Sequence, residues 1–229
     1  MKILSIDTSS NICAIAVLED NMLLKEYSKN NGLTHSETLM PMIKELLSLL
    51  NLNLSDIDLI VCDKGPGSFT GIRIGVATAK AFSDSLNIKS IGISSLEALA
   101  YNVDFDGIIC PMIDAKNDNV YTGIFEKIGN TFLLKRNFSL ENIDSMINEF
   151  NGVTYDVNFV GDGAFKYKEK ISKILPNSMC VSNNDLSAYN LGLAGYNHFL
   201  NNDFPDVLPL YLRKPQAERM LEKNNILKG

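Results

Sequence analysis

One order of secondary-structure elements occurs twice along the chain, and this repeat limits the possible fold more than any other feature of the sequence. In each half, apolar runs separated by polar turns predict three strands, a helix, a strand and a helix. The first half holds these elements at 3–6, 12–18, 22–27, 36–50, 59–62 and 72–86, with a strand at 88–93 and a short helix capped by Ser94. The second half holds them at 108–113, 120–126, 132–138, 139–150 with Ser139 as cap, 157–160 and 164–175, with a strand near Val181 and a helix at 186–200. A period of about 20 to 50 residues is missing, so the pattern indicates a duplicated α/β domain and not a solenoid.

Length and composition agree with two lobes. The chain has 229 residues, 45% of them hydrophobic, which excludes a disordered protein. We expect a first, partner-binding lobe at 1–103, a second lobe at 104–208, and a C-terminal helix at about 209–229, amphipathic over 216–227, that packs on the first lobe. The formal net charge of -6 argues against a protein that binds nucleic acid by itself. The first apolar run ends at Ile6, too early for a signal peptide or membrane span, so a cytoplasmic protein is expected.

A glycine-rich loop follows the predicted strand 59–62 and opens the next helix; residues 64–75 read KGPGSFTGIRIG. Glycines allow positive φ values, and the first amides of a helix can receive an anion. The loop is therefore either a phosphate cradle or a tight strand-to-helix turn with Ser68 or Thr70 as cap. It lacks the ending of a P-loop and the glycine spacing of a dinucleotide-binding fold, so neither motif applies.

The helices at 36–50 and 72–86 carry more apolar and small residues than a one-sided surface helix needs. Apolar side chains cover about half the circumference of the first helix, whereas a stripe a little over about 100° wide is sufficient. The second helix is rich in small residues, Gly75, Ala77, Ala79 and Ala81. Either both helices are enclosed between a sheet and the second lobe, or they form a subunit interface.

Candidate catalytic residues are few. The two histidines, His35 and His198, are far apart and form no metal-binding pair on one helix, which argues against a metal hydrolase. A nucleophile at Ser68 would need a base, and the position of His35 at a helix start is better explained by a cap or interface contact. The four cysteines, Cys13, Cys62, Cys110 and Cys180, lie among apolar neighbours without a C-x-x-C pair and are expected to be buried thiols.

The duplicated order of elements resembles the actin, hexokinase and Hsp70 ATPase superfamily. The resemblance implies an α/β fold of two actin-like (ASKHA, ribonuclease H-like) lobes with mixed sheets. In that superfamily, an acidic residue after the first strand of each lobe points into a cleft that holds phosphates and metal. Asp7 and Asp114 occupy these positions, but Ser9 and Lys116 stand where glycines usually follow.

Specific motifs resemble the bacterial TsaB (YeaZ) family of tRNA threonylcarbamoyladenosine biosynthesis proteins. They are ILSIDTS at 3–9, HSE at 35–37 with Pro41, GPGSFTGIRIG at 65–75, SSLEALA at 94–100 and PLYLR at 209–213. The resemblance runs nearly end to end, and the long glycine motif is its specific part.

The family resemblance implies a non-catalytic subunit that binds the catalytic paralogue TsaD. Together with the ATPase TsaE, the complex transfers a threonylcarbamoyl group to N6 of adenosine 37 in tRNAs reading ANN codons. It implies a homodimer when TsaD is absent, contact with tRNA only through the complex, and no membrane. No cofactor or metal of the chain itself is implied, because Leu39 stands where the paralogue has its second metal-binding histidine; ATP or ADP is implied only at the interface of the complex. The alternatives are an ATP-dependent kinase or ATPase of the same fold and a peptidase.

The resemblance also assigns candidate residues. The partner interface comprises His35, Glu37, Leu39, Met40, Ile43, Leu47, Ile74, Ala77, Thr78 and Ala81. The candidate nucleotide- or anion-binding set comprises Asp7, Thr8, Ser9, Gly65, Gly67, Ser68, Thr70, Gly71, Arg73 and Asp114. The sequence departs from the family at Lys116 and Asn119, where arginine and glutamate are usual, and lysine lacks the planar fork of arginine.

Overall fold

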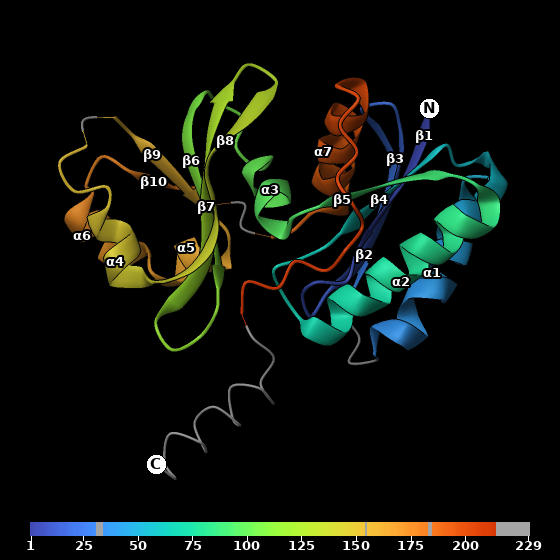
Figure 1. The fold of residues 1–229 in the computed structure, drawn as a ribbon, viewed down its shortest axis with the longest axis horizontal. Helices are drawn as coiled ribbons and strands as arrows, with labels where there is room; N and C mark the ends of the chain where they lie inside the picture. The colour runs from blue at the N-terminus through green and yellow to red at the C-terminus, as the bar shows by residue number, and fades with distance from the viewer. Residues whose placement is uncertain (31–33, 154, 183–184, 214–229) are drawn as a thin grey trace, which may run out of the picture.

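The computed structural model describes residues 1–30, 34–153, 155–182 and 185–213, which form two lobes around two five-stranded sheets (Figure 1). The first sheet comprises β1 (Lys2–Asp7), β2 (Cys13–Glu19), β3 (Met22–Lys29), β4 (Leu59–Asp63) and β5 (Lys89–Ile93), in the order β3-β2-β1-β4-β5. The second comprises β6 (Gly107–Asp114), β7 (Asn119–Ile128), β8 (Thr131–Asn142), β9 (Val157–Val160) and β10 (Met179–Cys180), in the order β8-β7-β6-β9-β10. Each sheet joins an antiparallel meander to two parallel strands, which confirms the predicted duplicated two-lobe fold.

Helices α1 (His35–Leu49) and α2 (Phe69–Leu86) cover one face of the first sheet. Glu37 accepts hydrogen bonds from the Thr34 backbone N–H and hydroxyl at the start of α1. Leu39, Ile43 and Leu47 are 1%, 3% and 6% exposed, because they pack against β1, β2 and β4 in the core of their own lobe. The prediction that these three residues supply apolar area to a partner interface is therefore wrong.

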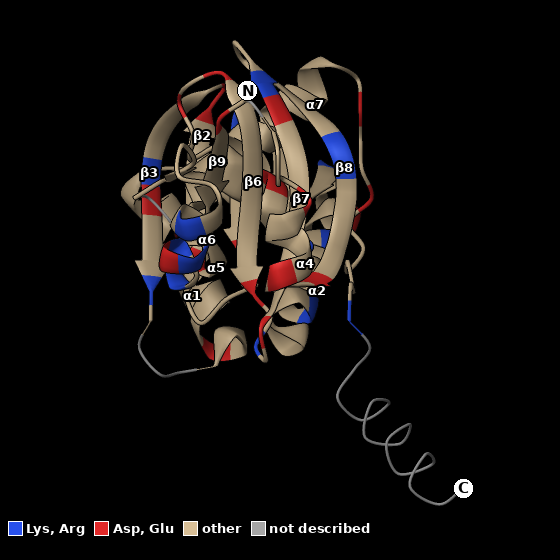
Figure 2. Cartoon of the chain, turned by 90° about the vertical axis from the view of Figure 1, so that its left-hand side faces the viewer, with Lys and Arg blue, Asp and Glu red and all other residues tan. Residues whose placement is uncertain are grey.

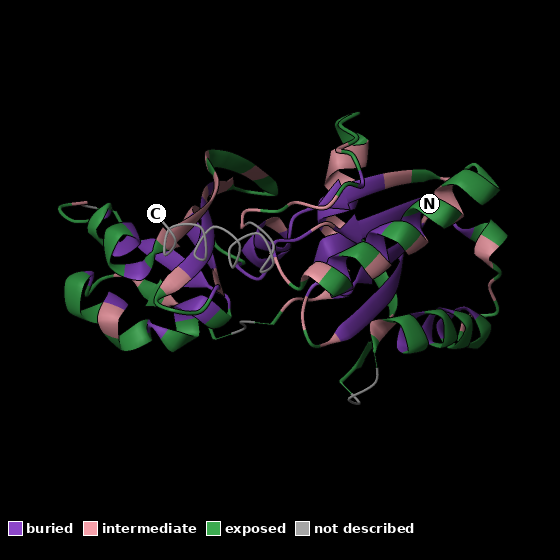
Figure 3. Cartoon of the chain, turned by 60° about the horizontal axis from the view of Figure 1, so that its bottom comes forward, coloured by how far each residue is buried: buried purple, intermediate pink, exposed green. Residues whose placement is uncertain are grey.

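The outer sides of α1 and α2 face away from the second lobe (Figures 1 and 3). Buried residues lie on the sheet side of both helices and exposed residues on the other, so enclosure by the second lobe is wrong as an explanation of their composition. Met40 and Leu49 on α1 are 49% and 58% exposed, and Ala77 and Ala81 are exposed on α2.

Helix α7 (Ala188–Leu200) covers the opposite face of the first sheet, although it comes from the end of the chain. Ala188, Leu191 and Ala194 pack into the core formed by β1, β2 and β4. The predicted boundary at 208 therefore places α7 in the wrong lobe, since a helix that follows the second sheet in sequence returns to the first. His198 Nε2 on α7 donates to Glu97 Oε1 at 2.7 Å, and this hydrogen bond raises the pKa of His198.

The second sheet carries the short helices α4 (Ile143–Asn148), α5 (Asp162–Lys166) and α6 (Lys168–Ile174) on one face. Helix α3 (Ser95–Ala100) lies between the two sheets, with Ala98 in the core under α7 and Leu99 in the core on the second sheet. The predicted cap Ser94 is confirmed, since its hydroxyl accepts from Glu97 N at 3.0 Å. Ser139 is not a cap: β8 continues beside β7 to Asn142, which caps α4 instead.

The remaining expectations concern the chain ends and the cysteines. Residues 209–213 are not helical, and the helix expected over 216–227 lies outside the described residues. Cys13, Cys62 and Cys110 are buried free thiols, and Cys180 is half-buried and free. Within the described ranges, none of the helices has the length and hydrophobicity needed to span a membrane.

The contrast between two neighbours on α1 gives a first prediction. Ile43→Ala should lower the free energy of unfolding by about 2–5 kcal/mol, because it leaves a cavity in the core of the first lobe. Met40→Ala should change it by less than about 0.5 kcal/mol, because Met40 lies on the outer side of the helix. Urea unfolding of the two variants measures both values, and equal losses would contradict this placement of α1.

Candidate functional site

The glycine-rich loop is a tight turn pressed against the residues that follow β1. A Cβ atom at Gly71 would lie 1.9 Å from the Thr8 carbonyl oxygen, and one at Gly67 would lie 2.3 Å from the Ser9 carbonyl oxygen. Thr8 Oγ1 donates to Gly71 O at 2.7 Å, and Ser68 N donates to Ser9 O at 2.7 Å. Ser68 is the cap of α2, since its hydroxyl accepts from Gly71 N at 3.2 Å. The glycines thus allow close packing of one backbone on another.

Two carboxyl groups are buried beneath this loop, at the carboxyl ends of β1 and β4. Asp7 accepts from Ser9 N at 2.7 Å, and Asp63 accepts from Gly65 N at 2.6 Å, Ser95 Oγ at 2.7 Å and Ser9 Oγ at 3.1 Å. Burial raises the pKa of Asp7; burial and the nearby charge of Asp7 raise the pKa of Asp63 well above its usual range. The pair is closed off from solvent, and this environment favours the protonated form of both carboxyl groups.

The matching position of the second lobe has a different environment. Asp114 accepts from Lys116 Nζ at 2.8 Å and Lys166 Nζ at 2.9 Å, and from Lys116 N at 3.0 Å. Its own backbone N–H donates to Asp162 Oδ1 at 2.9 Å. Partial burial acts to raise the pKa of Asp114, but the hydrogen bonds from the two lysines outweigh it and lower the pKa. The Asp114 carboxylate is thus neutralised by two ammonium groups.

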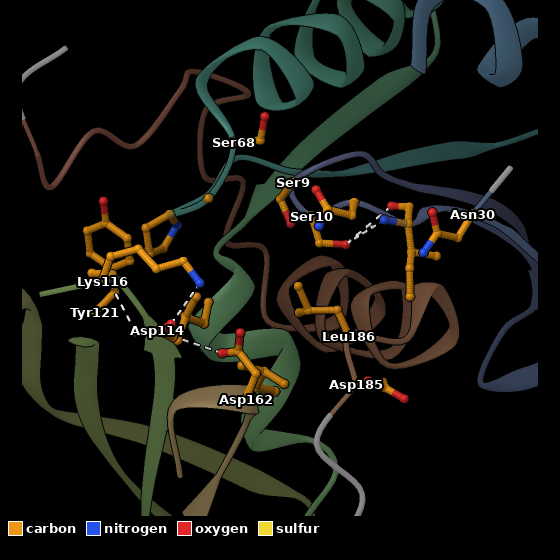
Figure 4. Close-up of a pocket in the computed structure, with 17 residues that line it drawn as sticks. Ser9, Ser10, Asn30, Ser68, Asp114, Lys116, Tyr121, Asp162, Asp185 and Leu186 are labelled. Atoms are coloured by element: carbon orange, nitrogen blue, oxygen red, sulfur yellow. Dashed lines mark hydrogen bonds and ion pairs between the residues drawn. The ribbon is translucent and has the colours of Figure 1, made fainter. Parts of the chain in front are cut away.

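The turn that follows β1 and the end of β6 face each other across a cavity of about 530 Å³ between the lobes (Figure 4). Its lining combines hydroxyl, amide and charged groups from both lobes: Ser9, Ser10, Asn11, Asn30, Gly67, Ser68, Asp114, Lys116, Tyr121, Asp162 and Asp185, with Ile12, Pro66, Leu99, Ile113, Ala115 and Leu186. In Figure 4, Lys116 extends toward Asp114, and Asp162 lies on its other side. We name this cavity the interlobe cleft.

The predicted anion-binding residues separate into three groups. Ser9, Gly67, Ser68 and Asp114 line the interlobe cleft. Asp7, Thr8, Gly65 and Gly71 are buried behind it. Thr70 and Arg73 are exposed on α2 and do not line the cleft, and Arg73 Nε donates to Tyr211 Oη at 2.7 Å. Binding of an anion or nucleotide at these residues remains a prediction.

Several lining residues were not predicted. Ser10 and Asn11 directly follow the motif 3–9, so adjacency was an available signal. Asn30 directly follows β3, Asp162 begins α5, and Asp185 precedes α7, and only the assembled fold brings them to the cleft.

The predicted interface residues also separate. Met40, Ala77 and Ala81 are exposed, and Ile74 and Thr78 are half-buried. Leu39, Ile43 and Leu47 are in the core. His35 is half-buried and contacts Ser10 O at 2.8 Å through Nε2, and exposed Glu37 is part of the helix cap. Among the described residues, no group of three or more His, Cys, Asp or Glu side chains could hold a metal ion.

The buried carboxyl pair gives a prediction about pH. Because burial raises the pKa of Asp63, the folded chain keeps a proton that the unfolded chain releases above about pH 4. Retention of this proton stabilises the folded chain at low pH, and the free energy of unfolding therefore falls as pH rises from about 4 through the folded-state pKa of Asp63. Asp63→Asn keeps an oxygen for Gly65 N and Ser95 Oγ without the charge, so its stability relative to the wild type should increase with pH.

Urea unfolding at intervals between about pH 5 and 9 tests this expectation. Asp84→Asn serves as the control, because Asp84 is an exposed carboxylate on α2. If Asp63→Asn had the same pH dependence of stability as the wild type, ionisation of the buried pair would not destabilise the folded chain, and the prediction would be wrong.

Comparison with known proteins places the chain in a family. The family model described as TsaD: tRNA N6-adenosine threonylcarbamoyltransferase matches residues 31–219. The tRNA threonylcarbamoyladenosine biosynthesis protein TsaB of Bacillus subtilis is 43% identical over 127 residues, 55% of this chain and 56% of that protein, so this match spans about half of the relative. TsaB of Buchnera aphidicola (Schizaphis graminum) is 34% identical over 176 residues, 74% of this chain and 82% of the relative.

Solved structures agree with this placement. YeaZ from Pseudomonas aeruginosa has a TM-score of 0.73 at 26% identity and covers 92% of this chain and 99% of its own. The activator of 2-hydroxyisocaproyl-CoA dehydratase from Clostridium difficile, with bound ADPNP, has a TM-score of 0.53 at 12% identity over 88% of this chain and 97% of its own; this likeness shows the fold alone. The motifs, the fold and these relatives together show that the chain belongs to the TsaB (YeaZ) family of tRNA threonylcarbamoyladenosine biosynthesis proteins.

Proposed function

We propose that this chain is a non-catalytic subunit that binds the catalytic subunit TsaD and, with the ATPase TsaE, supports transfer of a threonylcarbamoyl group to N6 of adenosine 37 in tRNA. Family membership supports the pathway, and the surface of the first lobe supports the role in assembly. In the absence of TsaD the same surface pairs two copies of the chain.

The observation that carries this proposal is the outer side of α1 and α2, which we call the α1–α2 face and define by Met40, Pro41, Leu49, Ala77 and Ala81. These apolar or small residues are exposed, although the sheet side of the same helices is fully packed. Small residues let a second pair of helices approach closely, and exposed apolar side chains gain free energy when they leave water. The face therefore suits a helical partner.

The chemistry of the interlobe cleft supports a non-catalytic role. Asp114 is held by Lys116 and Lys166, and Asp7 is buried and hydrogen-bonded to Ser9 N. A kinase of this fold needs both carboxylates open to a metal-bound nucleotide, because they act at the phosphates. In this arrangement neither carboxylate is available without a rearrangement of the turn that holds it.

The charge distribution supports contact with tRNA through the complex. The formal net charge is -6, and Figure 2 shows acidic and basic residues interspersed over the elements that face the viewer. Binding to the phosphate backbone requires a concentration of Lys and Arg, and the described residues on this face do not provide one.

The α1–α2 face gives a prediction about assembly. Met40→Glu combined with Ala81→Glu should weaken binding to TsaD by more than about a hundredfold, because the contact would bury unpaired carboxylates. The variant should remain folded, since both positions are exposed. Calorimetric titration with TsaD measures the affinity, and thermal unfolding verifies the fold.

Leu133→Glu on β8 is the matched control, because Leu133 is an exposed apolar residue of the other lobe. The control should bind TsaD with wild-type affinity. Retention of wild-type affinity by the double variant would refute the assignment of the face.

The cleft gives a prediction about turnover. The isolated chain should hydrolyse ATP far below about 1 s⁻¹, the lower end of ordinary enzyme turnover, and addition of TsaD and TsaE should produce turnover and tRNA modification. Phosphate release measures ATP hydrolysis, and nucleoside analysis of tRNA measures the modification. Turnover near 1 s⁻¹ by the isolated chain would favour the kinase or ATPase alternative.

A further inference from the structure

The segment 203–213, which we call the strap, follows α7 and runs along the first lobe toward the second (Figure 1). Two backbone hydrogen bonds fasten it to the first lobe: Gly92 N donates to Pro205 O at 2.8 Å, and Leu210 N donates to Lys64 O at 2.7 Å. The strap therefore lies against the end of β5 and the start of the glycine-rich loop, and it is not a free tail.

Tyr211 attaches the strap to the start of α2. Its ring stacks on Phe69 with centroids 4.7 Å apart and planes at 15°, and its hydroxyl accepts from Arg73 Nε at 2.7 Å. The Arg73 guanidinium lies 5.5 Å from the centre of the Tyr211 ring. Tyr211 is 40% exposed, so this aromatic and cationic cluster is open to a partner.

The cluster continues the α1–α2 face, because Arg73 lies one helical turn before Ala77. Tyr and Arg are the residue types that most often dominate binding energy at protein interfaces. Among the described residues, only Nε of the Arg73 guanidinium has a hydrogen bond, so its two terminal nitrogens suit a carboxylate of the partner.

Two residues further along, the strap attaches to the second lobe. Arg213 Nη1 donates to Ala115 O at 2.6 Å. Leu212 packs against the buried cluster of Leu96, Ala115 and Tyr121. Tyr211 and Arg213 are separated by at most about 7 Å of chain, so a displacement of one of these residues also displaces the other.

The turn that receives Arg213 has an unfavourable backbone. Lys116, Asn117 and Asp118 have φ values of 63°, 53° and 55°, a left-handed conformation that costs side-chain-bearing residues free energy. Ala115 N donates to Asn119 O at 2.9 Å and Asn119 N to Lys116 O at 3.1 Å, which closes the turn. Since this turn places Lys116 at the interlobe cleft, contacts from outside help to fix the cleft wall.

We propose that the strap couples docking on the α1–α2 face to the 115–119 turn, a role that rests on the function proposed above for the existence of a partner. A partner that covers Tyr211 and Arg73 holds the strap against α2. The strap then holds the Ala115 carbonyl through Arg213, and the turn at the interlobe cleft becomes more rigid. By linkage, loosening the turn weakens docking by the same factor.

Hydrogen exchange of the amides in 115–119 tests the strap in the isolated chain. Arg213→Ala should accelerate exchange about tenfold, because it removes a charge-assisted hydrogen bond. Tyr211→Ala should also accelerate it, and Tyr211→Phe, which keeps the stack on Phe69, should have a smaller effect. Lys127→Ala is the matched control, because Lys127 Nζ donates to a backbone carbonyl, that of Asp104, at 2.8 Å away from the strap. Wild-type exchange in Arg213→Ala and Tyr211→Ala would overturn the proposal.

A second measurement adds purified TsaD. It should slow exchange in 115–119 about fivefold in the wild type, whereas Arg213→Ala should still bind TsaD, about fivefold more weakly, without slowing. Equal slowing in Arg213→Ala, or no slowing in the wild type, would overturn the coupling. If wild-type chain does not bind TsaD, the proposed function fails, and the isolated variants still decide whether the strap fixes the turn.

Discussion

The contact between the start of α2 and the turn after β1 determines the rest of the first lobe. Gly71 lies so close to the Thr8 carbonyl that a methyl group has no room. Hydrogen bonds from Thr8 Oγ1 to Gly71 O and from Ser68 N to Ser9 O join the two segments. This packing fixes the beginning of α2 relative to the sheet. It closes the loop over the Asp7 and Asp63 carboxyls and leaves the other side of α2, with Arg73, turned outward. The glycine motif therefore orients a surface helix.

Duplication has given the lobes the same framework and different surfaces. Each lobe has an acidic residue at the end of its first strand, Asp7 on β1 and Asp114 on β6. One carboxyl is buried under backbone and the other is paired with two lysines, so the similar positions differ in burial and in charge. The exposed apolar residues Met40 and Leu49 lie on α1 of the first lobe, away from the cleft. The interlobe cleft and the exposed side of α1 and α2 therefore lie on different parts of the molecule.

Local patterns predicted the order of strands and helices along the chain, the cap Ser94, and the positions of Asp7 and Asp114, because these depend on residues near each other in sequence. They offered Ser68 and Thr70 as caps of α2, and the structure selects Ser68. The apolar arc of α1 predicted a helix correctly but not which side its own sheet would cover, so Leu39, Ile43 and Leu47 were misplaced. The lobe to which α7 returns, and the bond from Arg73 to Tyr211 across 138 residues, depend on tertiary packing, which no short sequence window contains.

The return of α7 to the first sheet has a consequence for biosynthesis. As the ribosome releases the chain from its N-terminus, all five strands of that sheet emerge more than ninety residues before the helix that covers one of their faces. Ile3, Leu18 and Val61 remain without their partners on α7 throughout this interval. The first lobe to be translated is thus completed last, and a nascent chain exposes an apolar sheet face that chaperones can recognise.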